Sequence, residues 1–128
     1  ATEAPALDVI YEEIAGSVEL VSPMVPTEDF IFNYYGIDIT TLEESVFVMS
    51  EDATSAETII MLKVADEEQL QTMEASLQTL LDDKAYEMED YLPDQYEIVK
   101  KSEVKTDGDY LWLVISESAD SIQAIIEK

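Results

Sequence analysis

The sequence predicts an α+β domain, in which a mostly antiparallel four-stranded sheet carries a long helix on one face. Short apolar segments group into two hairpins, and an unbroken helical pattern from Glu67 to Tyr91 separates them. Shorter helical patterns precede the first hairpin and follow the second, which gives the order α-α-β-β-α-β-β-α. A chain of 128 residues suffices for one hydrophobic core. We therefore expect one domain over residues 1–128, with residues 1–6 either disordered or added to the natural chain.

Two helices are predicted before the sheet. The segment from Leu7 to Leu20 keeps a helical face. Its apolar members are Leu7, Ile10, Tyr11, Ile14 and Val18. A second helix fits Thr27 to Tyr35, because Thr27 is a suitable N-cap and Gly36 can end the helix in the left-handed conformation. The connector that follows is expected to hold one helical turn begun by Thr40 or Thr41.

The first hairpin and the long helix have the clearest patterns. Residues 45–50 and 58–64 are rich in β-branched and apolar side chains, and their near-continuous apolarity predicts strands covered on at least part of both faces. In the long helix, seven apolar side chains recur every three or four residues. They are Leu70, Met73, Leu77, Leu80, Leu81, Met88 and Tyr91. Asp66 with Gln69 resembles a capping box, and Leu92-Pro93-Asp94 ends the helix.

A second hairpin and a last helix complete the prediction. The strands Tyr96 to Thr106 and Tyr110 to Ser116 flank Asp107-Gly108, a strong hairpin signal. The first strand alternates polar residues and carries three lysines, which suits an exposed edge. The second is almost wholly apolar and is expected inside the sheet. Ser116 or Ser118 then caps a final helix that buries Ala119, Ile122, Ile125 and Ile126.

Missing residue types limit the chemistry of the chain. It has no histidine, cysteine or arginine, so it lacks the usual neutral general base, thiolate nucleophile and bidentate anion clamp. Three glycines cannot build a phosphate-cradling loop. A net charge of -24 disfavours nucleic acids and anionic lipids as partners. We expect no catalytic residue, no cofactor and no nucleic-acid partner.

The 30 carboxylates leave two alternatives open. A hydrolase of cell-wall glycans that uses carboxylates alone needs two of them about 5–10 Å apart in a cleft. Adjacent pairs such as Asp82-Asp83 do not create that arrangement, and solvated faces explain them more simply. The segment Thr106-Asp107-Gly108-Asp109 lacks the ligand spacing of a calcium loop, so no dedicated metal site is predicted. Low-affinity binding of divalent cations to the acidic surface is the second alternative.

Tyrosines provide the candidate ligand site. Their flat apolar rings with a polar tip suit peptides or sugars, although sealing the rim of the core is their simpler role. If a ligand site exists, we expect it where Tyr34-Tyr35-Gly36 approaches Tyr91 and Tyr96.

Several segments resemble one known family. They are Phe30 to Asp38, Tyr91-Leu92-Pro93-Asp94-Gln95-Tyr96 and Asp107-Gly108-Asp109-Tyr110, together with the strand pair between the first two. They are similar to short lipoproteins of Clostridia and related Gram-positive gut bacteria, grouped as domain of unknown function four-three-five-eight. The resemblance runs from about Thr27 to the end of the chain. It implies export through a signal peptide with a lipidated cysteine upstream of Ala1, and it implies no activity or functional residue.

Together these observations favour a binding protein outside the cytoplasm. The sequence has no run of about 18 apolar residues that could span a membrane, and the opening Ala1-Thr2-Glu3 without an initiator Met is typical of a trimmed chain or a mature end. We expect a non-enzymatic domain that is lipid-anchored to the outer face of a Gram-positive membrane. It would bind a peptide, a protein or a small ligand, and it would meet the membrane only through its anchor.

Overall fold

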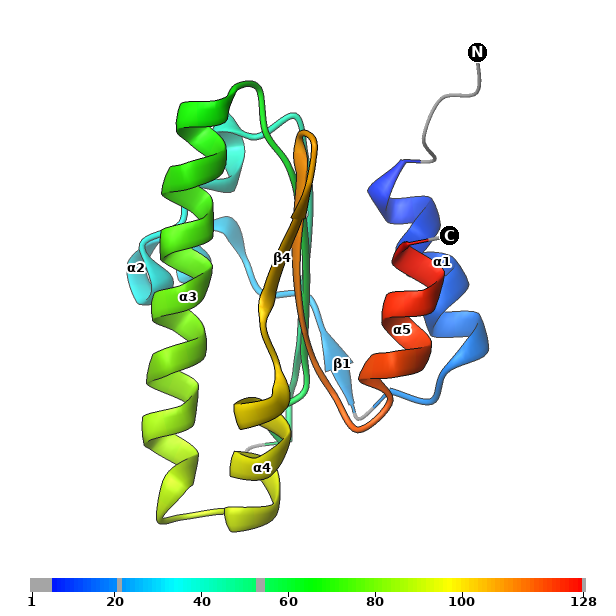
Figure 1. The fold of residues 1–128 in the computed structure, drawn as a ribbon, viewed down its shortest axis with the longest axis vertical. Helices are drawn as coiled ribbons and strands as arrows, with labels where there is room; N and C mark the ends of the chain where they lie inside the picture. The colour runs from blue at the N-terminus through cyan, green and yellow to red at the C-terminus, as the bar shows by residue number, and fades with distance from the viewer. Residues whose placement is uncertain (1–5, 21, 53–54, 128) are drawn as a thin grey trace.

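A five-stranded antiparallel sheet forms the centre of the protein (Figure 1). The computed structural model describes residues 6–20, 22–52 and 55–127. In chain order the strands are β1 (Pro23–Met24), β2 (Glu44–Ser50), β3 (Thr58–Lys63), β4 (Val104–Asp107) and β5 (Tyr110–Ile115). They lie side by side in the order β1-β2-β3-β5-β4, and each neighbouring pair is antiparallel. The predicted α+β class, the interior position of β5 and the edge position of β4 are confirmed.

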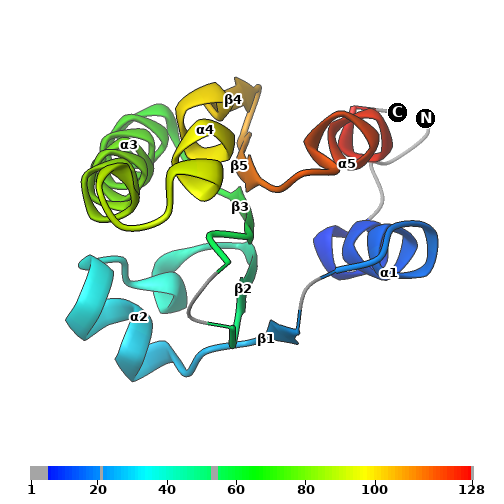
Figure 2. The same ribbon diagram turned by 90° about the horizontal axis from the view of Figure 1, so that it is seen from below.

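Helices cover both faces of this sheet. They are α1 (Leu7–Ser17), α2 (Glu28–Tyr35), α3 (Glu67–Glu89), α4 (Pro93–Lys101) and α5 (Ala119–Ile126), and a 3-10 turn spans Ile39–Thr41. Figure 2 shows three layers, with α2, α3 and α4 on one face and α1 and α5 on the other. The long helix therefore lies on one face as predicted, and the two terminal helices form the opposite layer.

The central strands feed two hydrophobic clusters, because alternate side chains of a strand point to opposite faces. In β3, Ile60 and Leu62 belong to the cluster under α3, whereas Ile59 and Met61 belong to the cluster under α1 and α5. In β5, Trp112 packs in the second cluster. The near-continuous apolarity of β3 and β5 thus reflects burial on both faces, in line with the predicted cover of the first hairpin and the predicted interior position of the last strand.

The predicted number of strands was wrong by one. The two-residue strand β1 pairs with the end of β2, where Pro23 lies opposite Ser50 and Met24 opposite Met49. Two residues are too short to show a period of two, and a proline interrupts any strand pattern. Proline is tolerated here because β1 is an edge strand, which needs no donor on its outer side.

The predicted strand from Tyr96 to Thr106 was also wrong over most of its length. Residues Pro93–Lys101 form α4, and only Val104–Asp107 are strand. Pro93 occupies the first turn, where its missing N–H costs nothing, and Lys100 and Lys101 occupy the last turn, where cations favour the helix dipole. The buried side of α4 has helical spacing, so the helical signal was present beside the apparent alternation.

The turn between β4 and β5 is shifted by one residue from the prediction. Asp107 pairs with Tyr110, so the two-residue loop is Gly108-Asp109 rather than Asp107-Gly108. Gly108 has φ +60°, and Asp109 is not among the residues with positive φ. That combination belongs to a type II′ turn, in which only the first loop residue needs the glycine.

The predicted helix ends are largely confirmed. The Thr27 hydroxyl accepts a hydrogen bond from the Phe30 N–H at 3.1 Å, and Gly36 ends α2 with φ +73°. The Asp66 carboxylate accepts from the Gln69 N–H at 2.8 Å at the start of α3. The prediction for residues 1–6 lies outside the described residues, except that Ala6 is the N-cap of α1.

Candidate functional site

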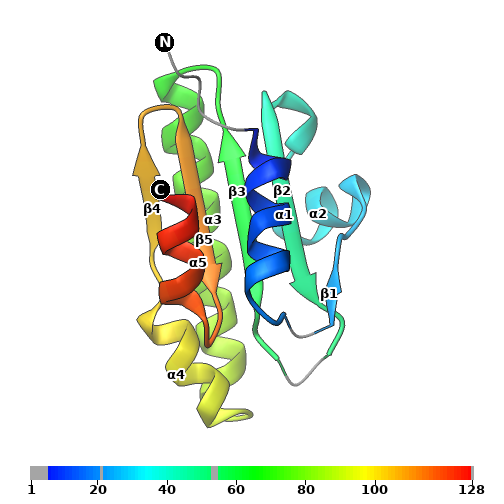
Figure 3. The same cartoon turned by 90° about the vertical axis from the view of Figure 1, so that its right-hand side faces the viewer.

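A groove opens between α1 and α5 on the face of the sheet opposite α3. The two helices lie side by side against the sheet (Figure 3), and the groove has a volume of about 330 Å³. Leu7 and Ile10 of α1 form one wall, and Ile125 and Ile126 of α5 form the other. The volume lies at the lower end of the range of about 300–1,000 Å³ for small-ligand sites. We call this site the α1–α5 groove.

The two walls form because both helices are amphipathic. Ile14 of α1 and Ile122 of α5 are fully buried against the sheet, so they fix the two helices there. The Glu44 carboxylate on β2 accepts a hydrogen bond of 3.0 Å from the Leu7 N–H, which fixes the start of α1. Ile10 and Ile125 lie nearer the helix edges and are only partly buried. They therefore line the groove instead of filling the core.

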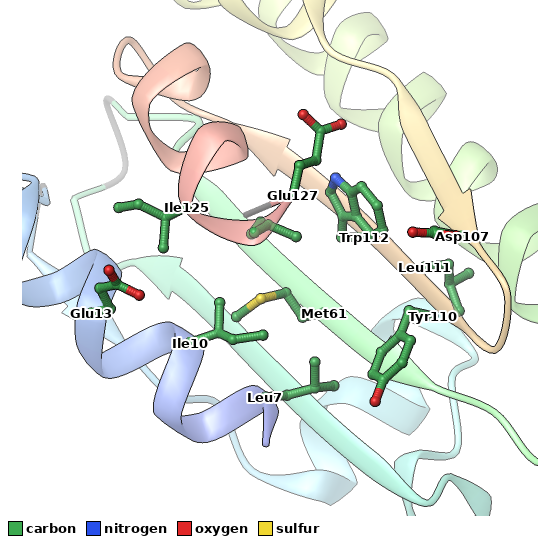
Figure 4. A pocket seen from close by; sticks show the side chains of 11 residues that line it. Leu7, Ile10, Glu13, Met61, Asp107, Tyr110, Leu111, Trp112, Ile125 and Glu127 are labelled. Atoms are coloured by element: carbon green, nitrogen blue, oxygen red, sulfur yellow. The ribbon is translucent and has the colours of Figure 1, made fainter. Parts of the chain in front are cut away.

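The floor of the groove contains a buried polar group that the described residues leave without a hydrogen-bond partner. Met61 of β3 and Trp112 of β5 are paired across the sheet and form this floor. Trp112 is only 7% exposed, and its buried indole Nε1 has no hydrogen-bond partner among the described residues. In Figure 4 this nitrogen lies on the edge of the ring that faces α5 and Glu127. Buried tryptophan N–H groups usually find an acceptor, so the vacant donor marks the groove as unusual.

The rim of the groove is acidic. Glu13, Asp107 and Glu127 contribute its charged side chains. The half-exposed Glu127 carboxylate lies 3.8 Å from the Lys105 ammonium, which also lies 3.9 Å from Glu103. Lys105 is the register partner of Trp112 in the sheet, so this ion pair lies beside Trp112 at the edge of the groove. The site thus combines an apolar floor, one vacant donor and a negative rim.

The structure divides the four tyrosines of the predicted site. Tyr34 and Tyr35 lie together on α2 with ring centres 4.9 Å apart. Tyr91 follows α3 and is 79% exposed, and Tyr96 lies on α4 with the Lys100 ammonium 5.8 Å from its ring centre. Tyr34 and Tyr35 line a surface hollow, and neither Tyr91 nor Tyr96 is among the residues that line it. Ligand binding by these tyrosines stays a prediction.

The hollow beside Tyr34 and Tyr35 is larger than the α1–α5 groove, with a volume of about 460 Å³. Lys84 of α3 also lines it, and desolvation by burial lowers the pKa of its ammonium, while the nearby Glu87 opposes that shift. The smaller α1–α5 groove differs from this hollow in its buried donor, for which the described residues provide no acceptor. Among the described residues, no side chain of the larger hollow has a buried unpartnered polar atom.

Tyr35 gives this region a measurable pH dependence. Desolvation by burial, with smaller contributions from Tyr34 and Glu87, raises the pKa of the Tyr35 phenol from 10.0 to about 12. A raised folded pKa contributes stability that is fully present below pH 10 and is lost as the pH rises toward 12. We expect wild type to lose stability relative to Tyr35→Phe between pH 10 and 12, as measured by urea unfolding. Tyr86→Phe is the matched control, since Tyr86 is 85% exposed; a Tyr35→Phe difference that stays constant with pH would contradict the assignment.

Most of the chain matches a known protein family. Residues 17–116, which are more than half of the 128-residue sequence, match the model of a domain of unknown function, DUF4358. The chain belongs to the DUF4358 family. This is the family that the sequence motifs resembled. No curated protein and no solved structure matches the chain.

The DUF4358 match covers the sheet and the layer of α2, α3 and α4. It includes only Ser17 of α1 and ends before α5 begins. The floor of the α1–α5 groove therefore lies inside the matched region, and its walls lie outside it. The Tyr34–Tyr35 hollow lies entirely inside the match.

The carboxylates of this DUF4358 member lie toward solvent. None of the described Asp or Glu side chains is buried, and Asp38, Glu44 and Glu57 are the partly buried ones. Among the same residues, no group of three or more could hold a metal ion. None of the described helices meets the length and apolarity needed to cross a membrane.

Sequence reasoning missed the groove for an identifiable reason. Trp112 was assigned to an interior strand, which is correct, but an unpartnered indole depends on what the neighbouring elements offer it. Leu7, Ile10 and Ile125 were recognised as members of apolar helical faces. Nothing in their spacing distinguishes a side chain that fills the core from one that lines a groove. A buried strand that carries a lone Trp between Leu residues was the one available signal.

Proposed function

We propose that this chain is a non-enzymatic binding domain and that its ligand lies in the α1–α5 groove. The observation that carries the proposal is the buried Trp112 N–H, for which the described part of the chain offers no acceptor. Leaving such a donor unsatisfied costs about 1–3 kcal/mol. A ligand that places an acceptor there recovers that free energy and also covers the apolar floor. Access requires the half-exposed Glu127 side chain to move aside, which its surface position permits.

Binding is favoured over hydrolysis by carboxylates. A glycosidase of this kind needs an acidic group whose pKa is raised by burial, together with a second carboxylate facing it. All described Asp and Glu side chains are at least partly exposed. The chain also lacks histidine and cysteine, so no common nucleophile–base pair is available within it.

We also propose that the domain works outside the cytoplasm, tethered to a Gram-positive membrane through a lipidated cysteine upstream of Ala1. The likeness of its motifs to short lipoproteins supports this location. Metabolic labelling of the native protein with a palmitate analogue tests it. We expect label in the membrane fraction, and an unlabelled protein in the cytosol would contradict the location without affecting the binding proposal.

Groove binding can be tested with N-phenyl-1-naphthylamine, a neutral apolar probe whose fluorescence rises in apolar sites. We expect the wild-type domain to enhance its fluorescence in a saturable way. Ile10→Gln places a polar amide in the groove. We expect this variant to bind the probe at least fivefold more weakly, because about 1 kcal/mol of apolar contact is lost.

The matched control is Val9→Gln, which makes an equivalent change on the same helix. Val9 is 53% exposed and does not line the groove, so we expect wild-type affinity. Circular dichroism of both variants confirms that they fold. A wild-type domain that does not bind the probe, or equal binding by wild type, Val9→Gln and Ile10→Gln, would overturn the assignment to the groove.

A further inference from the structure

We propose that the occupant of the α1–α5 groove is a basic peptide segment, in which an apolar side chain lies beside a lysine or arginine. This inference rests on the proposed function and specifies its ligand class. Three features of the groove carry it, namely its charge, its vacant hydrogen-bond donor and the ion pair at its edge.

The charge of the groove selects a cationic partner. Glu13, Asp107 and Glu127 place three carboxylates around an apolar floor. Among the described residues, the lysine at this edge is Lys105, and it already lies within 4 Å of two carboxylates, those of Glu103 and Glu127. The net charge of -24 adds a long-range field of the same sign, which attracts cations and repels anions. An apolar ligand with a negative group would therefore be disfavoured at this rim.

The vacant donor selects a carbonyl close to the apolar part of the ligand. The Trp112 indole N–H can only donate, so its partner must be an acceptor. A peptide offers a backbone carbonyl next to every apolar side chain, and its basic side chain can reach outward to the rim. A simple alkylamine supplies the apolar body and the cation but has no such acceptor. The combination therefore favours a peptide over a free amine.

The ion pair at the edge sets the direction of two charge substitutions. Glu127 lies beside the nitrogen-bearing edge of the indole in Figure 4, and the Lys105 ammonium lies 3.8 Å from its carboxylate. A cationic ligand competes with Lys105 for Glu127. Removing the Glu127 charge should therefore lower the affinity for a basic peptide, whereas removing the Lys105 charge should raise that affinity.

The test uses three peptides that differ only in their last side chain, acetyl-Ile-Leu-Lys-amide, acetyl-Ile-Leu-Gln-amide and acetyl-Ile-Leu-Glu-amide. The sequence has one tryptophan, so the indole N–H gives a single NMR cross-peak that assigns itself. We expect this peak to shift in a saturable way. The lysine peptide should bind about tenfold more tightly than the glutamate peptide, since each exposed charge pair changes affinity by about two- to fivefold. Hexylamine should bind more weakly than the lysine peptide.

Charge variants of the domain separate the rim from the overall field. We expect Glu127→Gln to lower the affinity for the lysine peptide about two- to fivefold, and Lys105→Gln to raise this affinity by a similar factor. Glu74→Gln on α3 changes the net charge by the same amount as Glu127→Gln, but it lies on the opposite side of the sheet. It should leave the affinity within a factor of about two.

The outcomes distinguish this inference from the proposed function. If the neutral naphthylamine probe binds in the groove but the three peptides bind equally or not at all, the basic-peptide inference is wrong and the groove remains the site. If hexylamine binds as tightly as the lysine peptide, the basic-peptide inference is likewise wrong and the ligand class is a small amine. Failure of both the probe and the peptides to bind would remove the proposed function itself.

Discussion

Leu77→Ala is expected to lower the free energy of unfolding by about 3–5 kcal/mol, the cost of a large cavity in a core that cannot collapse fully. Leu77 lies near the middle of α3, is fully buried and belongs to the cluster beneath that helix. The loss of transfer free energy and the cavity act together. Because the free energy of unfolding of natural domains is typically about 5–15 kcal/mol, the variant should still fold, but its urea midpoint should be clearly lower.

Leu70→Ala is the matched control for this prediction. Leu70 lies on the same helix but is only partly buried against the same cluster. The same truncation there should cost less than half as much, since solvent can fill the space. Equal losses for the two variants would mean that α3 does not pack on the sheet in the manner described.

Gln95→Ala is expected to cost about 1–3 kcal/mol, because it leaves a buried donor without a partner. The Gln95 side-chain oxygen accepts a hydrogen bond of 2.9 Å from the N–H of Ala56, a fully buried residue ahead of β3. The bond links α4 to the segment that enters the sheet. Chemical denaturation measures the loss, and amide hydrogen exchange at Ala56 should accelerate in the variant.

Gln78→Ala provides the corresponding control. Gln78 is exposed on α3, and its amide donates to the Asp82 carboxylate at 3.0 Å without serving any buried group. Truncation there should change stability by no more than about 0.5 kcal/mol, as expected for surface substitutions. A Gln95→Ala variant as stable as Gln78→Ala would show that the Ala56 N–H finds another acceptor.

Much of the fold followed from local patterns. The helix α3 was predicted because its apolar period continues over six turns and Asp66 supplies a cap that the structure confirms. The strands β3 and β5 were predicted because most of their side chains are apolar, which is typical of strands buried on two faces. In each case one signal, periodicity or composition, ran long enough to dominate.

The errors arose where two signals competed or the element was short. In α4, alternating polar residues indicated a strand, while Pro93 at the first turn and lysines in the last turn indicated a helix. Packing of Val99 into the cluster under α3 accompanies the helix. The strand β1 has two residues, so only its pairing with β2 defines it.

The candidate site was less predictable than the fold. Tyr34 and Tyr35 are adjacent on one helix, so their proximity followed from sequence, but their distance from Tyr91 and Tyr96 depends on how α2, α3 and α4 pack. The groove depends on contacts between α1 and α5, which stand at opposite ends of the chain. A local sequence pattern cannot predict a contact between helices so far apart in the chain. It also cannot predict that a buried donor at this contact lacks an acceptor.

The central claim is that the α1–α5 groove holds a ligand through the floor formed by Trp112. NMR mapping of a ¹⁵N- and methyl-labelled domain titrated with N-phenyl-1-naphthylamine tests it most directly. We predict saturable shifts of the Trp112 indole N–H and of the Ile10, Ile125 and Ile126 methyl groups. Shifts confined to the surroundings of Tyr34 and Tyr35 on the other side of the sheet, or no saturable shift at all, would contradict it.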